Sequence, residues 1–177
     1  MSVMVSLDAF DLLEAALVAE RIAVIRSVLK STKEFVDGVS SFERHYIGAL
    51  GEVAVCKHFG VRHPRAVVSG GDNGVDLVIN GWKAQIKCRT YLGKDPEIIF
   101  KTLDYFKADV CIATKLESAT KIAIVGCISR TRFRKIAEQK NYGYGDHWCV
   151  PETALDDVCV ITENRRQEQA IQQEITA

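Results

Sequence analysis

The sequence predicts an α/β protein in which helices flank a mixed β-sheet. Three patterns indicate this fold class: apolar residues at helical spacing in the N-terminal third, an Asn-Gly dipeptide between short apolar runs, and two further apolar runs after Lys107. With 47% hydrophobic residues, a chain of 177 residues can bury one core. We expect a single domain, with a helical N-terminal extension over 1–40, a core over 41–162 and a polar tail over 163–177.

The residues before the first expected strand are predicted to form helices. Apolar residues recur with this spacing from Leu7 to Phe35, which fits one long helix or two shorter ones. A further helix begins at Ser40, because a serine followed three residues later by Glu43 forms a capping box. It ends near Phe59, since Gly60 readily adopts the left-handed conformation that closes a helix.

The dipeptide Asn80-Gly81 predicts a tight β-hairpin, because both central residues of a type I′ turn need a positive φ. With these two residues as the loop, apolar side chains oppose one another on one face: Ile79 and Trp82, Leu77 and Ala84, Val75 and Ile86.

The other face of this hairpin is polar. Asp76 lies opposite Gln85, and Lys87 follows Gln85 on the same face. Opposed side chains have Cβ atoms about 4.5–5.5 Å apart, which is close enough for Asp76 and Gln85 to share one cation.

Other elements are expected on both sides of the hairpin. A strand over Ala66–Ser69 precedes it, and strands over Asp109–Lys115 and Lys121–Ile128 follow it. The segment Ile98–Phe106 is of mixed character, and a helix capped by Ser129 covers Thr131–Gln139.

The polar face of the hairpin suits phosphodiester hydrolysis. Mg²⁺ prefers oxygen ligands, which the carboxylate of Asp76 and the amide oxygen of Gln85 would supply. Lys87 would position or deprotonate the attacking water, or stabilise developing negative charge. Glu52, in the preceding helix, is a candidate for an outer carboxylate or a ligand of a second metal.

These residues resemble the PD-(D/E)XK nuclease superfamily, whose restriction-endonuclease-like core has the order αβββαβ. Its signature is a helical Glu, an Asp on one strand and (Glu/Gln)-x-Lys on the next. The matching segments, over roughly 41–135, are GALGEVAV with Glu52, GVDLVI with Asp76, and AQIKCRT with Gln85 and Lys87. The sequence after them resembles small phage and bacterial nuclease-like proteins.

The resemblance implies a nuclease that depends on Mg²⁺ or Mn²⁺ and acts on DNA rather than RNA, in DNA processing, recombination or restriction. The commonest form of the signature has Glu where this chain has Gln85, and the neutral amide gives Glu52 more weight as a ligand. The alternative is a catalytically degenerate member that serves as a nucleic-acid-binding or structural module.

The formal net charge of +0 argues against extensive wrapping by DNA. Local contacts to phosphate remain possible, and the candidates are Lys83, Arg89, Arg130, Arg132 and Arg134. For Arg89, a salt bridge is an equal alternative.

Composition also bears on location and partners. No run reaches the ~18–20 apolar residues that span a bilayer, and the N-terminus lacks the basic start of a signal peptide. The six cysteines include no CxxC and the four histidines are scattered, so a zinc site is not expected. We expect a cytoplasmic protein, bacterial or encoded by a phage, with no membrane partner, and with a homodimer through the N-terminal helices as one use of that region.

Overall fold

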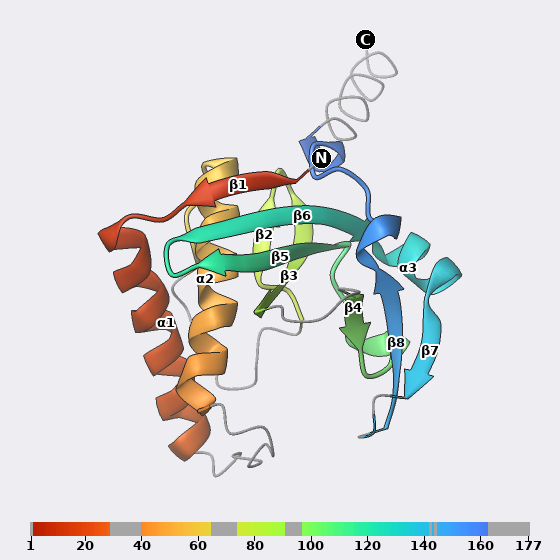
Figure 1. Ribbon diagram of the computed structural model, residues 1–177, viewed down its shortest axis with the longest axis horizontal. Helices are drawn as coiled ribbons and strands as arrows, with labels where there is room; N and C mark the ends of the chain where they lie inside the picture. Colours follow the sequence, from red (N-terminus) through yellow and green to blue (C-terminus); the bar gives the residue numbers. More distant parts are fainter. Residues whose placement is uncertain are drawn as a thin grey trace.

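A five-stranded mixed sheet forms the centre of the molecule, with two helices on one side and a smaller sheet on the other (Figure 1). The structure is a computed structural model that describes residues 2–28, 40–64, 74–90, 97–141, 143 and 145–162. The mixed α/β class predicted from the sequence is therefore confirmed.

In the central sheet β3 and β5 are parallel and all other neighbours are antiparallel. The strand order is β1 (Val3–Ser6), β6 (Lys121–Ser129), β5 (Val110–Ser118), β3 (Trp82–Thr90), β2 (Leu77–Ile79). The smaller antiparallel sheet has the order β4 (Glu97–Phe100), β8 (Asp146–Pro151), β7 (Glu138–Asn141). The helices are α1 (Ala9–Val28), α2 (Ser41–Phe59) and α3 (Arg130–Ile136), with 3-10 turns η1 (Leu103–Tyr105) and η2 (Glu152–Ala154).

Both ends of α2 follow the sequence prediction. The Ser40 hydroxyl accepts a hydrogen bond from the Glu43 N–H, and Gly60 closes the helix with a φ of 64°. In between, Gly51 lets α2 approach the sheet closely. A Cβ atom at this position would lie 2.6 Å from both the Cβ of Cys88 and the Oγ1 of Thr114.

The hairpin turn also forms as predicted. Asn80 and Gly81 have φ angles of 49° and 78°, and the pairs Ile79–Trp82 and Leu77–Ala84 are in register.

The predicted pairing of Val75 with Ile86 is wrong, and the ladder does not include the expected pair of Asp76 and Gln85 either. The N–H of Asp76 donates to the carbonyl of Ala84, the residue that already faces Leu77, so the regular ladder ends there. Val75 consequently packs in the cluster on the opposite side of the sheet from Ile86.

Two apolar clusters cover the two faces of the central sheet. The first lies under α1 and α2 and includes the inward residues of the hairpin: Leu77, Ile79, Ala84 and Ile86. The second lies under the small sheet and α3, where the rings of Phe100, Phe106 and Phe133 contact one another. The candidate site therefore lies on the face covered by the second cluster, because Gln85 and Lys87 alternate with Ala84 and Ile86.

Residues 2–28 are more than a helical extension. Residues Val3–Ser6 form β1, which pairs with β6 at the edge of the sheet, and α1 packs against α2. A strand of four residues is too short to show a period in the sequence, and its pairing with a distant strand determines its conformation. This segment is part of the core, since Val5, Leu7, Ala15 and Val18 are buried in the first cluster.

The connection between the parallel strands β3 and β5 differs from the αβββαβ order. Its described residues form β4 and η1, where that order has an α-helix. The helix expected to run to Gln139 ends at Ile136 and is followed by β7. The predicted strand 66–69 and the tail from residue 163 lie outside the described residues. Within the described part of the chain, no helix is long and apolar enough to cross a membrane.

Candidate functional site

Gln85, Lys87 and Arg89 project from one face of β3, the face turned away from α2. In the parallel register of β3 and β5, Gln85 pairs with Cys111 and Lys87 pairs with Ala113. The small Ala113 leaves open space beside Lys87, and this space is part of a pocket in the structure.

Asp76 is held at the start of the hairpin, next to this face. Its Oδ2 accepts a hydrogen bond of 2.6 Å from the backbone N–H of Ile86, which fixes the carboxylate against β3. The Cys111 thiol, on the neighbouring strand β5, is affected by the charges of this face. Burial raises the pKa of this thiol to about 12; the positive charges of Lys87 and Arg89 lower it, and the negative charge of Asp76 raises it. All three charged groups therefore lie within electrostatic range of one point on this face.

The side-chain oxygen of Gln85 is the unusual atom of the site. Oε1 is buried and accepts no hydrogen bond from any described residue. Gly74, with a φ of 73°, lies against this amide: a Cβ atom on Gly74 would be 3.8 Å from Oε1 and 3.3 Å from the carbonyl oxygen of Tyr105. Buried carbonyl oxygens almost always have a partner, and leaving one unpaired costs about 1–3 kcal/mol. The donor set beside Asp76 thus suits a hard cation, whose ligands are carboxylate and amide oxygens.

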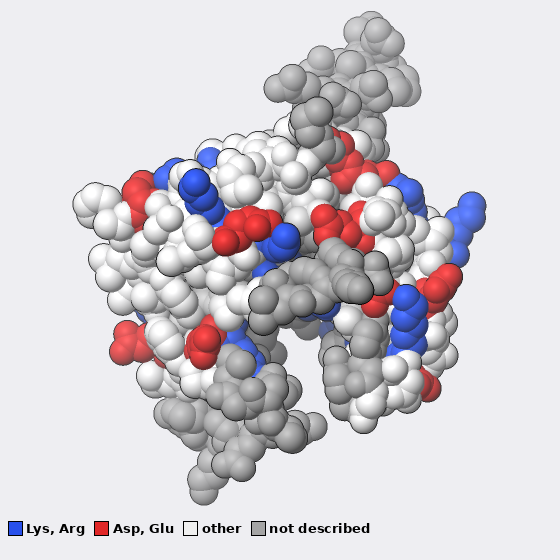
Figure 2. Space-filling model, in the orientation of Figure 1, with Lys and Arg blue, Asp and Glu red and all other residues white. Residues whose placement is uncertain are grey.

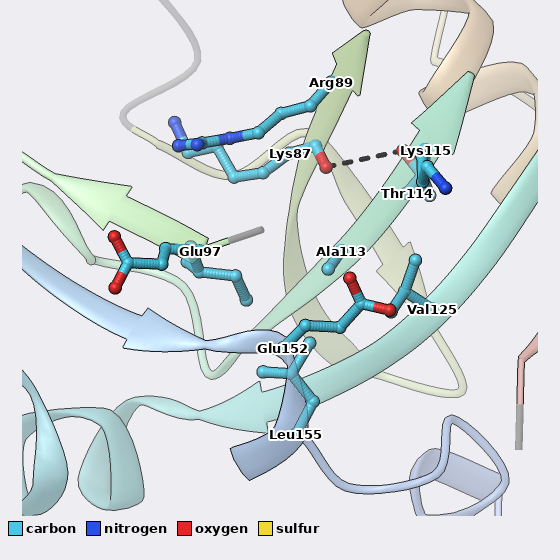
Figure 3. A pocket seen from close by; sticks show the side chains of 10 residues that line it. Lys87, Arg89, Glu97, Ala113, Thr114, Lys115, Val125, Glu152 and Leu155 are labelled. Atoms are coloured by element: carbon cyan, nitrogen blue, oxygen red, sulfur yellow. Dashed lines mark hydrogen bonds between the residues drawn. The ribbon is translucent and has the colours of Figure 1, made fainter. Parts of the chain in front are cut away.

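Lys87, two residues further along β3 on the same face as Gln85, lines a pocket to which neither Gln85 nor Asp76 contributes. Its Nζ is 5.0 Å from the centre of the Phe100 ring, and no described carboxylate pairs with it. Figure 3 shows Lys87 and Arg89 extending side by side from β3, with Glu97 and Glu152 on the surrounding walls. The pocket lining is completed by Ile98, Ala113, Thr114, Lys115, Val125 and Leu155.

Two other charged groups of the pocket are neutralised within the fold. Glu97 pairs with Lys140 at 2.5 Å, and Lys115 pairs with Glu117 at 2.8 Å. Lys87 has no ion pair with a described carboxylate, although Glu152 lines the same pocket.

Glu52 has a different neighbour from the one expected. Its Oε2 lies 2.8 Å from Nε2 of His63, and His63 is buried. Glu52 also lies near Cys88, where burial raises the pKa of the thiol and the Glu52 charge adds to the rise. The Glu52 carboxylate therefore lies beside His63 and within electrostatic range of Cys88, and its role at the metal stays a prediction.

Sequence reasoning missed His63. It follows α2 in an irregular segment, so no periodicity or motif marks it, and only the three-dimensional fold brings it to Glu52. Its Nδ1 is buried and has no hydrogen-bond partner among the described residues. Within the described ranges, no group of three or more His, Cys, Asp or Glu side chains could hold a metal without the help of other ligands.

The three arginines of α3 have partners inside the fold. Arg130 donates to the carbonyl of Lys107 at 3.0 Å, Arg132 forms an ion pair with Asp156, and Arg134 lies 3.2 Å from Asp104. These contacts give each arginine a structural role that was not visible in the sequence.

Lys83 and Arg89 share the polar face of β3. Lys83 is exposed and lies nearer the hairpin turn, and Arg89 lines the pocket beside Lys87. Acidic and basic side chains alternate over the face seen in Figure 2, with no field of one sign. In the same view the molecule is hollowed between the helical side and the side with the small sheet, and atoms of basic side chains are visible in the hollow.

Comparisons with protein family models and with curated proteins found no match for this chain. The geometry of the site and the sequence motif are therefore what indicate a function.

Proposed function

We propose that this protein is a nuclease that depends on Mg²⁺ or Mn²⁺ and hydrolyses phosphodiester bonds, with DNA as its substrate. The observation that carries the proposal is the buried Oε1 of Gln85, which accepts no hydrogen bond from the described residues and lies on the face of β3 that also presents Lys87, while Asp76 is fixed to the same strand by the Ile86 N–H. A cation stabilises a buried oxygen that accepts no hydrogen bond, and metal-dependent hydrolysis of a phosphodiester needs a divalent cation beside the scissile phosphate.

Asp76 and Gln85 would hold the metal. When bound, a divalent cation neutralises phosphate charge and lowers the pKa of a bound water. The protein supplies the orientation: the Ile86 N–H fixes the Asp76 carboxylate, and Gly74 lies against the Gln85 amide. Both ligands are thus in place before substrate arrives, which limits the cost of reorganisation.

Lys87 would act on the scissile phosphate. Its ammonium group extends in the same direction as the Arg89 guanidinium, so both charges can reach one phosphate backbone (Figure 3). A fixed positive charge in a setting with little water stabilises the negative charge that develops in the transition state. Lys87 is placed to do so because no described carboxylate competes for it.

The DNA substrate and the restriction-endonuclease-like core come from the resemblance of the motif. The hairpin with Asp76 on one side and Gln85-x-Lys87 on the other agrees with that core, as does the parallel neighbour of β3. The crossover through β4 and η1 would be a departure from it.

A binding module is the second candidate function. It is favoured by one observation: the neutral amide of Gln85 leaves Asp76 as the only carboxylate at the hairpin, while Glu52 is engaged by His63. A weakly held metal would leave a protein that binds nucleic acid through Lys87 and Arg89 without cutting it.

Substitution of Asp76 by Asn tests the proposal. The amide oxygen of Asn can still accept the Ile86 N–H, so the fold is kept while the charge is removed. We expect Mg²⁺- or Mn²⁺-dependent cleavage by the wild-type protein to fall by about 100-fold or more in Asp76→Asn. The assay uses supercoiled, linear, branched and single-stranded DNA, and Asp104→Asn, an exposed carboxylate on η1, is the matched control.

Each outcome of this assay has one meaning. Equal cleavage by wild type and Asp76→Asn would remove Asp76 from the site. DNA binding without cleavage in either metal would replace the nuclease by the binding module.

A further inference from the structure

Helix α1 carries apolar residues on both of its sides. Ala15, Val18 and Ala19 are buried against the core. On the outer side, Phe10, Leu13, Leu17 and Val24 are 83%, 57%, 47% and 54% exposed. A surface helix of a monomer normally presents polar residues to water, and a row of large apolar side chains marks a contact surface.

We propose that α1 packs antiparallel against α1 of a second copy of this chain, about a two-fold axis. The outer row has the spacing of a heptad seam: Phe10, Leu17 and Val24 take one core position, and Leu13 and Glu20 take the other. The residues just before the first set are Ala9, Ala16 and Ala23, which are small enough for the two helices to approach closely.

In an antiparallel pair, the residues at one core position of the first helix face the residues at the other core position of the second helix. Leu13 of one copy then meets Val24 of the second copy, and Leu17 meets the aliphatic part of Glu20, whose carboxylate can extend to the rim. The two-fold axis makes each contact occur twice. Such a contact between identical surfaces closes on itself and gives a dimer rather than a chain of molecules.

Charges at the edge of the row select this direction. Glu14 and Arg21 lie on the same side of the row, and in the antiparallel register Glu14 of one copy lies beside Arg21 of the second copy. A parallel pair would instead place both side chains beside alanines. Each of the two also has an interaction within its own chain, so they set the direction of the pair while the apolar row supplies the contact.

The dimer leaves the candidate site open. Helix α1 lies on one face of the central sheet, and Gln85 and Lys87 project from the other. Dimerisation can therefore be measured independently of nuclease activity, and the two proposals can fail separately.

Sedimentation equilibrium of the full chain tests the association. We expect a dimer, with a dissociation constant raised by about 100-fold or more in Leu17→Glu, since the change affects both copies at the centre of the contact. Val78→Glu is the matched control, because Val78 is 60% exposed but lies on β2. Circular dichroism verifies that both variants are folded. A wild-type protein that stays monomeric at high micromolar concentration, or a Leu17→Glu variant that dimerises as the wild type does, would overturn the proposal.

Cysteine crosslinking tests the direction. Chains carrying Leu13→Cys are mixed with chains carrying Val24→Cys and oxidised, and the linked peptides are identified by mass spectrometry so that the native cysteines do not interfere. The antiparallel pair predicts a link between positions 13 and 24. A link between position 13 of both copies would contradict it.

Discussion

Replacing Lys87 by Met is expected to lower the rate of metal-dependent DNA cleavage by about a thousandfold. Methionine keeps most of the aliphatic length of the Lys87 side chain and loses the ammonium group that lies over the Phe100 ring, so the substitution removes the charge and little of the packing. The lost stabilisation belongs to the transition state, so we expect the effect on the single-turnover rate at saturating DNA and a smaller one on DNA affinity.

Arg89→Met is the comparison for this prediction. Arg89 extends beside Lys87 from the same strand, and we place it on the phosphate backbone rather than at the reacting group. Its substitution should weaken DNA binding and leave the rate at saturation nearly unchanged. Wild-type cleavage by Lys87→Met, or an equal effect of both variants on the rate at saturation, would remove Lys87 from the chemistry.

Substitution of Gly51 by Ala is expected to destabilise the fold by about 2 kcal/mol. The added Cβ would lie 2.6 Å from the Cβ of Cys88 and 2.6 Å from Oγ1 of Thr114, both on the central strands. Helix α2 would have to move away from β3 and β5, and this cost exceeds the gain of about 1 kcal/mol that alanine gives in a helix interior.

Gly48→Ala in the same helix provides the control. No atom lies within 4 Å of a Cβ at Gly48, so this change should stabilise the protein by up to about 1 kcal/mol. Urea unfolding of the two variants measures both free energies. If Gly51→Ala is as stable as Gly48→Ala, the close approach of α2 to the sheet is wrong.

Local signals in the sequence predicted the parts of the fold that are determined locally. The Ser40 cap, the Gly60 end of α2 and the Asn80-Gly81 turn depend on neighbouring residues, and all three form as predicted. The predicted register holds up to Leu77–Ala84 and does not continue to Asp76–Gln85 or Val75–Ile86, because the hydrogen bond from the Asp76 N–H to Ala84 ends the regular ladder and no residue type announces such a change.

Elements that depend on distant partners were missed. Strand β1 exists because it pairs with β6, and β8 pairs with both β7 and β4 in a small second sheet. These strands have only four to six residues, which is too short for the alternation that marks a half-buried strand to be recognised.

In the candidate site, too, local features were predicted and contacts between distant segments were not. Alternation along β3 was sufficient to place Gln85 and Lys87 on one face, and the buried neighbours Ala84 and Ile86 agree with it. The contact of Glu52 with His63 and the partners of the α3 arginines join segments far apart in the chain. A single sequence contains no local pattern that predicts such contacts.

Binding of Mn²⁺ to Gln85→Met tests most directly whether the Gln85 oxygen, which has no hydrogen-bond partner in the described part of the chain, is a metal ligand. Methionine has a similar length and no oxygen. Titration calorimetry should show saturable Mn²⁺ binding to the wild-type protein, tighter binding to Gln85→Glu and none to Gln85→Met. Without metal, Gln85→Met should be more stable than wild type by about 1 kcal/mol, because it removes a buried oxygen that lacks a hydrogen bond. Equal Mn²⁺ binding by wild type and Gln85→Met, or no binding to either, would contradict the account.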